Sequence, residues 1–263
     1  MTENHAFLQI LSWNVNGLRA VVKKGFADIL ARIQPDIVCI QETKLQENQI
    51  PGEIARLPGY RAYFSSAEKK GYSGVALFTR REPEEVSYGF GIDRFDTEGR
   101  ILIARYPGFD LMNIYFPNGK MSRERLAYKM DFYEACRAEA VRRLRDGRHV
   151  IICGDVNTAH TEFDIARPKE NEKRSGFLPE ERAWIDSLLE SGFVDTFRMF
   201  SPEGGQYTWW DLKTRARERN VGWRIDYFFV DASFSSRVRD SRILDTVMGS
   251  DHCPILLEVG EEP

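Results

Sequence analysis

Three carboxylates of this sequence lie at the ends of strongly apolar segments, where they could act together on one substrate. Glu42 and Asp155 each follow such a segment, and Asp251 precedes one. Taken singly, each is more often the cap of a turn. Carboxylates that meet at one place repel one another unless a divalent cation neutralises them. Together with the amide oxygens of Asn16 and Asn157 they would form a hard ligand set, which suits Mg²⁺, or Mn²⁺ in its place, better than zinc.

His252 directly follows Asp251, and another acid, Asp226, lies in the strand-like segment before it. A lone histidine is more often a hydrogen-bonded structural residue than a catalyst. An Asp–His pair, however, fixes the imidazole tautomer and stabilises the imidazolium ion, which attracts a charged phosphorane. We therefore expect Asp226 and His252 to act together, whereas His149 and His160 have no such setting.

The sequence lacks the motifs of several other protein classes. It has neither the Gly-x-Ser-x-Gly elbow of a serine hydrolase nor a Gly-x-x-x-x-Gly-Lys loop that cradles nucleotide phosphates. The four cysteines are far apart, so neither a disulfide framework nor a zinc site is expected. No secretory-signal pattern and no apolar run of roughly 20 residues is present. We expect a cytoplasmic enzyme with no membrane attachment and no nucleotide cofactor.

Basic residues are concentrated in one segment, although the formal net charge is −3. Residues 213–224 include five bases and one acid, and Trp209 and Trp223 bracket most of them. Cations that neutralise phosphates, beside rings that stack on bases or line a sugar pocket, are typical of a nucleic-acid groove. The alternative is a solvated basic loop whose tryptophans belong to the core. Residues 167–174 form a second, weaker candidate because their acids offset the bases.

Apolar and alternating segments predict the elements that must position these side chains. Buried strands are expected at 8–13, 37–40, 150–153, 225–230 and 255–257, and shorter strands at 74–80, 100–105 and 110–116. Helical spacing predicts helices over 18–33, over 122–145 and from Pro179 onward. These patterns therefore indicate an α/β fold in which helices flank the first and the middle buried strands.

Two segments far apart in the chain are faintly similar: Ile10–Asn16 and Ile151–Asn157 are both buried strands that end in a polar-x-Asn triplet. The match is too short to prove a repeat. It fits two packed sheets that bring their strand ends to one shared edge, with helices outside. The 263 residues contain no linker-like segment, so one domain is expected over 1–263, with its core at about 8–258.

Six blocks of the sequence resemble the signature motifs of the exonuclease III-type apurinic/apyrimidinic (AP) endonucleases, most closely the bacterial and archaeal members. In the family's order they are Leu11–Arg19, Pro35–Lys44, Tyr115–Asn118, Cys153–Asn157, Asn220–Tyr227 and Gly249–Pro254. The resemblance implies a DNase I-like four-layer α/β-sandwich, with two packed mixed β-sheets flanked by helices. It also implies a monomeric, Mg²⁺-dependent enzyme that cuts double-stranded DNA 5′ to an abasic site and leaves a 3′-hydroxyl. Exonuclease activity in the 3′-to-5′ direction and cleaning of damaged 3′ ends are further implied activities.

The resemblance also implies which residues surround a cation. Glu42 would be the principal ligand, with Asn16 and Asp251 near the ion. The metal would polarise the phosphate and stabilise the leaving oxyanion. The full set of candidate ligands is Glu42, Asn16, Asp251, Asp155, Asn157 and His252.

Catalytic roles follow from the same resemblance. Asp155 would orient or deprotonate the attacking water. Hydrogen bonds to the pentacovalent phosphorane would come from Asn157, Tyr115 and His252. Asp226 would hold His252. Asn14 would support this group through hydrogen bonds behind it.

For DNA, the resemblance implies that Trp223, Trp209 and Ile225 line a pocket for a flipped abasic sugar, which is cheap to extrude because it has no base to unstack. The remaining candidate DNA contacts are Arg224, Asn118, Asn171, Lys120 and Lys213. The chain departs from some relatives at Asn16, where they have aspartate, and at Lys213, in a loop from which they insert methionine. Which groups penetrate the duplex, and whether deoxyuridine is nicked, are left open.

Two alternatives come from different classes. The first is a related phosphodiesterase that acts on RNA or on small phosphodiesters, because the metal and Asp–His chemistry would be shared. The Trp- and Arg-rich segment favours a long polyanion instead. The second is a catalytically silent DNA-binding module. Such a protein would be expected to have lost several of its catalytic residues, yet all five are present: Glu42, Asp155, Asp226, Asp251 and His252.

Overall fold

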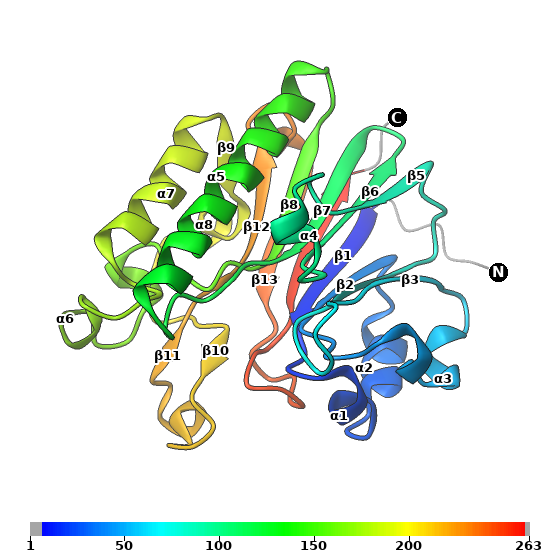
Figure 1. The fold of residues 1–263 in the computed structure, drawn as a ribbon, viewed down its shortest axis with the longest axis horizontal. Helices are drawn as coiled ribbons and strands as arrows, with labels where there is room; N and C mark the ends of the chain where they lie inside the picture. Colours follow the sequence, from blue (N-terminus) through cyan, green and yellow to red (C-terminus); the bar gives the residue numbers. More distant parts are fainter. Residues whose placement is uncertain (1–6, 261–263) are drawn as a thin grey trace.

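The computed structural model describes residues 7–260, and its main strands form two six-stranded mixed β-sheets (Figure 1). The first sheet has the order β13-β14-β1-β2-β4-β3, with β1 parallel to β2 and antiparallel to β14. Its strands are β1 (Phe7–Asn14), β2 (Ile37–Gln41), β3 (Arg61–Ser65), β4 (Val75–Thr79), β13 (Val238–Ile243) and β14 (Ile255–Gly260).

The second sheet has the order β5-β6-β7-β8-β12-β9, with β8 parallel to β7 and antiparallel to β12. Its central strand β8 therefore has the same pattern of neighbours as β1. The strands are β5 (Glu85–Tyr88), β6 (Ile101–Tyr106), β7 (Phe109–Tyr115), β8 (Val150–Asp155), β9 (Phe193–Asp195) and β12 (Asp226–Asp231). A separate two-stranded hairpin, β10 (Trp209–Trp210) with β11 (Gly222–Trp223), projects below the sheets in Figure 1.

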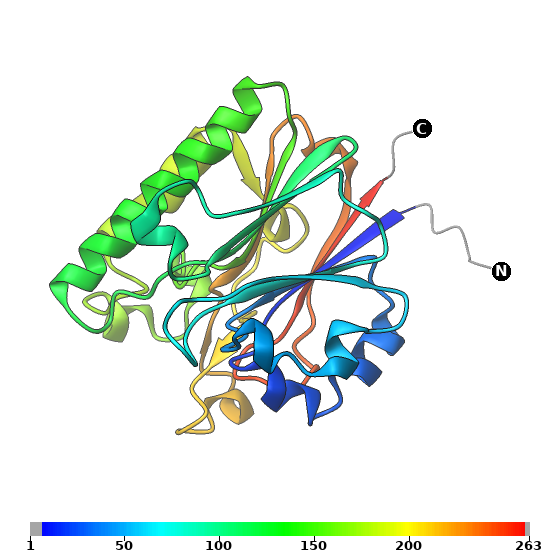
Figure 2. The ribbon, with the colours of Figure 1, turned by 45° about the vertical axis from the view of Figure 1, so that its right-hand side comes forward.

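Helices cover the outer face of each sheet, so the molecule has four layers (Figure 2). The helices are α1 (Leu18–Val22), α2 (Phe26–Ile33), α3 (Gly52–Ala55), α4 (Asp93–Asp96), α5 (Arg123–Arg145), α6 (Pro168–Asn171), α7 (Pro179–Glu190) and α8 (Thr196–Phe200). Short 3₁₀ turns span Glu47–Gln49, Glu162–Asp164, Ala216–Arg219 and Ser235–Arg237. The predicted DNase I-like sandwich is confirmed. The helix predicted at 122–145 is also confirmed, and the Ser122 hydroxyl caps it by accepting from the Arg125 amide at 3.2 Å.

Alternation along the strands explains which residues face the space between the sheets. In β1, Leu8 and Ile10 belong to the core between the two sheets, whereas Leu11 and Trp13 pack against α1 and α2. In β8, Ile151 and Cys153 face the same inner core. Because side chains alternate from one face to the other, the strand ends Asn14 and Asp155 also point inward. The predicted shared edge of two sheets is therefore confirmed at the ends of β1 and β8.

The helix predicted over 18–33 is wrong in one respect, since the structure has two helices there. The first helix ends at Val22, and Gly25, with a left-handed φ of 91°, is the N-cap of the second. A residue without a Cβ adopts this conformation at little cost, so the glycine is the breakpoint. Apolar spacing continues across the break because α1 and α2 bury the same face on the first sheet.

Among residues 7–260, no helix is both long and apolar enough to cross a membrane.

Candidate active site

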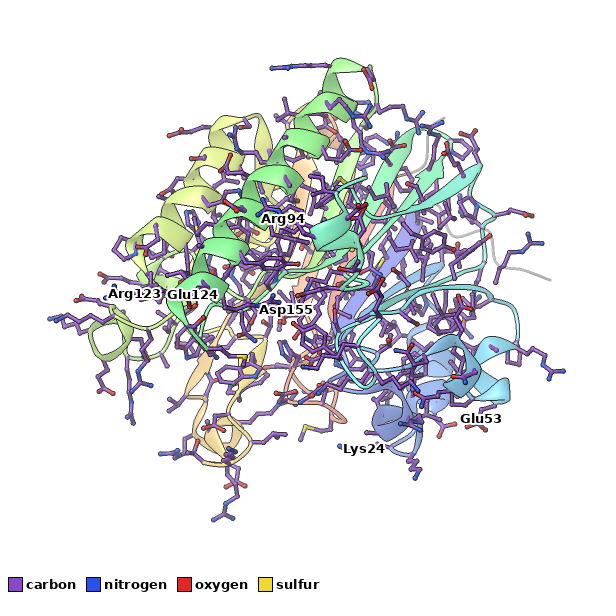
Figure 3. All side chains as sticks on the ribbon, in the orientation of Figure 1. Lys24, Glu53, Arg94, Arg123, Glu124 and Asp155 are labelled. Carbon is purple, nitrogen blue, oxygen red and sulfur yellow. The ribbon has the colours of Figure 1, made fainter. Side chains whose placement is uncertain are left out.

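Asn14 and Asp155, the last residues of β1 and β8, meet between the two sheets. Asn14 Nδ2 donates to Asp155 Oδ2 at 2.8 Å and to Glu42 Oε2 at 3.2 Å. Figure 3 places Asp155 in the interior, at the lower ends of the central strands. Asn14 is fully buried and Asp155 nearly so. One amide thus joins a carboxylate from each sheet.

The turns after β1 and β8 have the same local geometry. The Asn16 amide donates to Asn14 Oδ1 at 2.9 Å, and the Asn157 amide donates to Asp155 Oδ1 at 2.8 Å. Asn16 and Asn157 both have left-handed backbones, with φ of 47° and 57°. Asparagine tolerates this conformation better than most residues, and each turn is closed by the side chain two residues earlier. The faint sequence similarity therefore corresponds to two matching turns that face each other at the site.

His252 lies beside Asp155 and is oriented by Asp226. His252 Nδ1 and Asp226 Oδ2 are 2.8 Å apart, and His252 Nε2 lies 3.9 Å from Asp155 Oδ2. The Thr208 hydroxyl donates to the same Asp226 oxygen at 2.6 Å. The main-chain oxygen of His252 accepts from the indole of Trp13 at 3.1 Å. Asp226 holds Nδ1 of the ring and Trp13 holds the main chain, so Nε2 is the nitrogen that faces Asp155.

The electrostatics of these buried groups are strongly coupled. Burial alone would lower the pKa of His252, but the carboxylates of Asp226 and Asp155 outweigh it and raise that pKa. Burial raises the pKa of Asp155; His252 opposes this rise, and the charge of Asp226 adds to it. An imidazolium ion that faces a carboxylate through Nε2 can donate a hydrogen bond to an anion bound between them.

Glu42, Asn16 and Asp251 form a second group of oxygens beside the first. Asn16 Nδ2 donates to Asp251 Oδ1 at 2.9 Å. The ammonium group of Lys44 lies 2.9 Å from Glu42 Oε1 and also contacts Asn16 Oδ1. Burial alone would raise the pKa of Asp251, but His252 and the hydrogen bonds from Asn16 and Trp209 lower it on balance. A cationic group already bridges Glu42 and Asn16, so this donor set fits a hard cation.

Two places could thus hold a metal ion. Within residues 7–260, one oxygen or nitrogen each from Asp155, Asp226 and His252 lie within 4.8 Å of one another. The His252 nitrogen that faces Asp226, however, is already hydrogen-bonded to it. The oxygens of Glu42, Asn16 and Asp251 form the other place, where the Lys44 ammonium contacts the first two and Asn16 and Trp209 donate to Asp251.

Tyr115, at the end of β7, lies next to these groups, and Arg100 packs on its ring. The Arg100 guanidinium is 4.6 Å from the ring centroid and donates to the Tyr115 carbonyl at 3.0 Å. Burial raises the pKa of Tyr115; Glu42 and Asp155 raise it further, against the opposing effect of Arg100. The hydroxyl is therefore neutral at pH 7 and can donate a hydrogen bond.

A groove of about 730 Å³ opens beside the strand ends, between the start of α5, the α6 loop and the β10–β11 hairpin. Trp209 and Trp223 line it, with their rings perpendicular at 6.2 Å. Its basic lining consists of Lys120, Arg123, Arg167, Lys173, Arg174 and Arg219. Of the hairpin tryptophans, Trp210 is buried in the core, whereas Trp209 and Trp223 are only partly buried. The basic segment therefore lies partly in the groove and partly in solvent.

Trp209 connects the groove to the site. Its indole nitrogen donates to Asp251 Oδ2 at 3.1 Å, and its backbone pairs with that of His252. The Lys120 ammonium lies 5.1 Å from the centroid of Trp209 and 6.0 Å from that of Trp223. Ile225 is buried in a small cluster against which both rings pack. An apolar, sugar-sized surface with a cation beside it therefore adjoins the carboxylates.

The other predicted DNA contacts are less uniform. Lys213 is exposed at the tip of the hairpin, and Asn118 is half-buried after β7. Asn171 lines the groove, but its amide nitrogen donates to the carbonyls of Ala166 and Arg167.

The prediction that Arg224 touches DNA is wrong. Only 1% of this residue is exposed. Its guanidinium donates to Asp164 Oδ1 and Asp195 Oδ2, each at 2.6 Å. A buried arginine must be paired in this way, so Arg224 anchors β11 instead of reaching a phosphate. The sequence could not separate it from its exposed basic neighbours, because its partners lie 60 and 29 residues away.

This buried network predicts a pH-dependent contribution to stability. Burial alone would raise the pKa of Asp164, but Arg224 and Arg198 lower it to about 2, from an ordinary 3.8. At about 1.4 kcal/mol per unit, ionised Asp164 contributes about 2 kcal/mol above pH 5, and this is lost as pH falls towards 2. The difference in unfolding free energy between the wild type and Asp164→Asn should therefore shrink by about 1 kcal/mol between pH 7 and pH 3. Urea titrations at pH 7, 5 and 3 measure it, and a difference independent of pH would refute the assignment.

Three residues of the site carried no assigned role in the sequence. Lys44 was detectable only as part of the block that contains Glu42. Arg100 and Thr208 lack a local signal, because their importance comes from contacts with Tyr115 and Asp226 that only the fold creates.

Comparison with known proteins finds relatives over nearly the whole chain. The model of the Endonuclease/Exonuclease/phosphatase family matches residues 11–252. The chain is 43% identical to an exodeoxyribonuclease of Bacillus subtilis over 95% of its own length and 98% of that protein's. It is 44% identical to the DNA repair nuclease APEX1 of Danio rerio, over 96% of this chain and 82% of the relative.

Solved structures show the same likeness. An AP endonuclease of Archaeoglobus fulgidus superimposes with a TM-score of 0.88 at 30% identity, covering 97% of this chain and all of the other. A 3′-5′ exonuclease of Neisseria meningitidis gives a TM-score of 0.88 at 29% identity, with 97% and 100% covered. The resemblance drawn from the six sequence blocks is confirmed, and the chain belongs to the endonuclease/exonuclease/phosphatase family.

Proposed function

We propose that this protein is a DNA repair nuclease that hydrolyses the phosphodiester 5′ to abasic sites in double-stranded DNA and leaves a 3′-hydroxyl. Relatives over nearly the full chain are named as an exodeoxyribonuclease and as a DNA repair nuclease, which supports 3′-to-5′ exonuclease and 3′-end-cleaning activity as well. The observation that carries the proposal is the junction at Trp209, whose backbone pairs with that of His252 and so joins a basic, Trp-lined groove to the buried Asp155–His252–Asp226 group.

In this proposal Asp155 acts on the attacking water and His252 acts on the phosphate. Asp155 accepts the proton of the attacking water or orients it, because its raised pKa brings it closer to that of a general base. His252, charged and held by Asp226, donates through Nε2 to a phosphoryl oxygen, where negative charge develops. Tyr115 and Asn157 supply further donors to the same oxygens, and Asn14 keeps Asp155 aligned.

We infer that Glu42, Asn16 and Asp251 hold the cation, with Mg²⁺ as the ion and Mn²⁺ as a substitute. The fit rests on the Lys44 ammonium, a positive group that already bridges two of these residues. When bound, the metal supplies charge that stabilises the phosphoryl and leaving oxygens. The chain's own contribution is a set of hard oxygen ligands and, behind them, Asn14.

The groove would take the duplex. Its six basic residues neutralise backbone phosphates, and Trp209 and Trp223 would enclose the extruded abasic sugar. This lining favours a long polyanion over a small phosphodiester, so the proposed substrate is DNA.

One gel experiment tests the proposed function. Duplexes that contain an abasic site, a deoxyuridine or a recessed 3′ end are incubated with Mg²⁺ or with EDTA, beside a small phosphodiester as competitor substrate. We expect fast incision 5′ to the abasic site, slower removal of 3′ nucleotides, and no product in EDTA. Faster turnover of the small phosphodiester than of the abasic duplex would reject the DNA assignment. The deoxyuridine lane decides whether that lesion is also a substrate.

Substitution of Glu42 should change the metal requirement. Glu42→Gln removes the charge but keeps the side chain's shape, so the Mg²⁺ concentration for half-maximal rate should rise at least about tenfold. Glu47→Gln, in a neighbouring exposed turn, is the matched control and should leave it unchanged. A Mg²⁺ titration of the incision rate measures both, and an unaltered midpoint in Glu42→Gln would exclude it as a ligand.

A further inference from the structure

A buried ion pair lies directly behind the turn that carries Asn157. Lys129 comes from α5 and Glu181 from α7; both side chains are fully buried, with Lys129 Nζ 2.6 Å from Glu181 Oε1. Burying two charges is costly, and apolar residues of similar size often replace such a pair without loss of stability. The pair has no part in the reaction proposed above, so its polar contacts need another explanation.

Lys129 holds the main chain of Asn157. Its ammonium group donates to the Asn157 carbonyl at 2.8 Å and to Thr158 Oγ1 at 2.9 Å, and with Glu181 this uses all three donors. Thr158 Oγ1 also donates to the Asn157 carbonyl, at 2.9 Å. The left-handed residue of the turn is thus fixed from behind, while its side-chain amide donates to the Phe116 carbonyl at 2.9 Å and to Asp155 at 3.2 Å.

The carbonyls on either side of Asn157 are held in the same way. The Tyr133 hydroxyl, also on α5, lies 2.8 Å from the Val156 carbonyl, and the Tyr227 hydroxyl lies 2.8 Å from that of Thr158. Three successive carbonyls therefore receive donors from side chains. These hydrogen bonds fix a loop that follows β8 and has no strand pairing of its own. A residue that contacts a reacting phosphate needs such support, because its position must hold to within a fraction of an ångström.

Glu181 fixes the groove wall on the other side of the pair. Its carboxylate accepts from Ser175 Oγ at 2.8 Å, from the Gly176 amide at 2.5 Å and from the Leu178 amide at 3.1 Å. Ser175 and Leu178 line the groove. A Cβ on Gly176 would lie 2.9 Å from the Trp223 ring, so this wall packs directly under the tryptophan.

We propose that Lys129 and Glu181 are positioning residues, which hold the Asn157 turn and the groove wall at Gly176 in one fixed relation. This inference rests on the proposed function: a phosphodiester bound in the groove is then aligned with Asn157 and Asp155. The direct link between the two parts is the hydrogen bond from the Ala159 amide to the Gly176 carbonyl, at 2.8 Å. The ion pair spans the same two segments from beneath.

The test uses the double variant Lys129→Met/Glu181→Gln in the full-length protein. Both side chains keep their approximate size and no charge is left unpaired, so the fold should persist, whereas a single substitution would strand a buried charge. We expect amide hydrogen exchange at Asn157 and Ala159 to accelerate at least about tenfold. On an abasic duplex, kcat should fall roughly 10²-fold with KM changed less than about threefold, as a misplaced catalytic group predicts.

The matched control lies at the other end of the same helix. Arg143 and Asp110 form a second buried pair, 14 residues or about 21 Å further along α5. Their further partners, Glu139 and Arg148, are partly exposed, so the double substitution leaves no fully buried charge unpaired. Arg143→Met/Asp110→Asn should leave exchange at Asn157 and kcat within about twofold of the wild type. Unchanged exchange and kcat in the Lys129/Glu181 variant would overturn the proposal, as would an equal loss in the control.

The two proposals fail separately. A wild type that leaves the abasic duplex intact rejects the proposed function. Faster amide hydrogen exchange at Asn157 in the Lys129/Glu181 variant, and not in the control, would still support the positioning of the turn, whatever the substrate.

Discussion

Asp155→Asn is expected to lower the turnover of an abasic duplex by roughly 10²- to 10⁴-fold, the range that a general base supplies. The neutral amide cannot accept the proton of the attacking water. The fold should tolerate the change, because burial already disfavours the Asp155 carboxylate and the charge of Asp226 repels it. The amide oxygen of the new residue can still accept from Asn14, which donates to Asp155 at 2.8 Å in the wild type.

Single-turnover incision and a binding titration with the same duplex separate the two effects. Kd for the abasic duplex should stay within about threefold of the wild-type value, since the groove residues are untouched. Full turnover in Asp155→Asn would overturn the role of Asp155. Loss of binding in parallel with turnover would point to a structural role instead.

His252→Ala is expected to lower turnover by roughly 10²- to 10³-fold, the loss typical of one preorganised donor to a charged transition state. The variant also leaves Asp226 buried without its imidazole partner, although the Thr208 hydroxyl still donates to it at 2.6 Å. For this reason His252→Asn is a useful second variant, because an amide can restore part of the donor function.

His149→Ala is the matched control for this second prediction. His149 also pairs with an aspartate, Asp231 at 3.1 Å, but immediately before the first residue of β8, roughly 20 Å from Asp155 by strand geometry. Its turnover should equal that of the wild type. If both histidine variants lose activity to the same degree, or if His252→Ala remains fully active, the Asp226–His252 pair is not catalytic.

The convergence of the site could be predicted from sequence because it depends on short, regular features. Asn14 and Asp155 each end a buried strand, and strand ends of layered α/β folds meet at one edge. The matching triplets that begin with these residues correspond to turns with the same hydrogen bond in the structure. Local pattern and overall topology agree at these positions.

Other features depended on contacts that sequence does not encode locally. Arg224 looks like its basic neighbours but is paired inside the protein. Lys129 did leave a signal, since it lies three residues after Leu126 and four before Tyr133, on the apolar face of α5. Its partner Glu181 is 52 residues away, and only the packing of α5 on α7 brings them together. The break at Gly25 was hidden because apolar spacing continues across it.

We propose that a hard cation binds to Glu42, Asn16 and Asp251, while Asp226 and His252 remain hydrogen-bonded to each other. A crystal of the protein with an abasic duplex and Mn²⁺, measured for anomalous scattering, locates the ion directly. We expect one strong peak in bonding distance of Glu42, with His252 Nε2 in hydrogen-bond contact with the scissile phosphate. A peak inside the Asp155–Asp226–His252 cluster with none at Glu42 would contradict the assignment of ligand and catalyst.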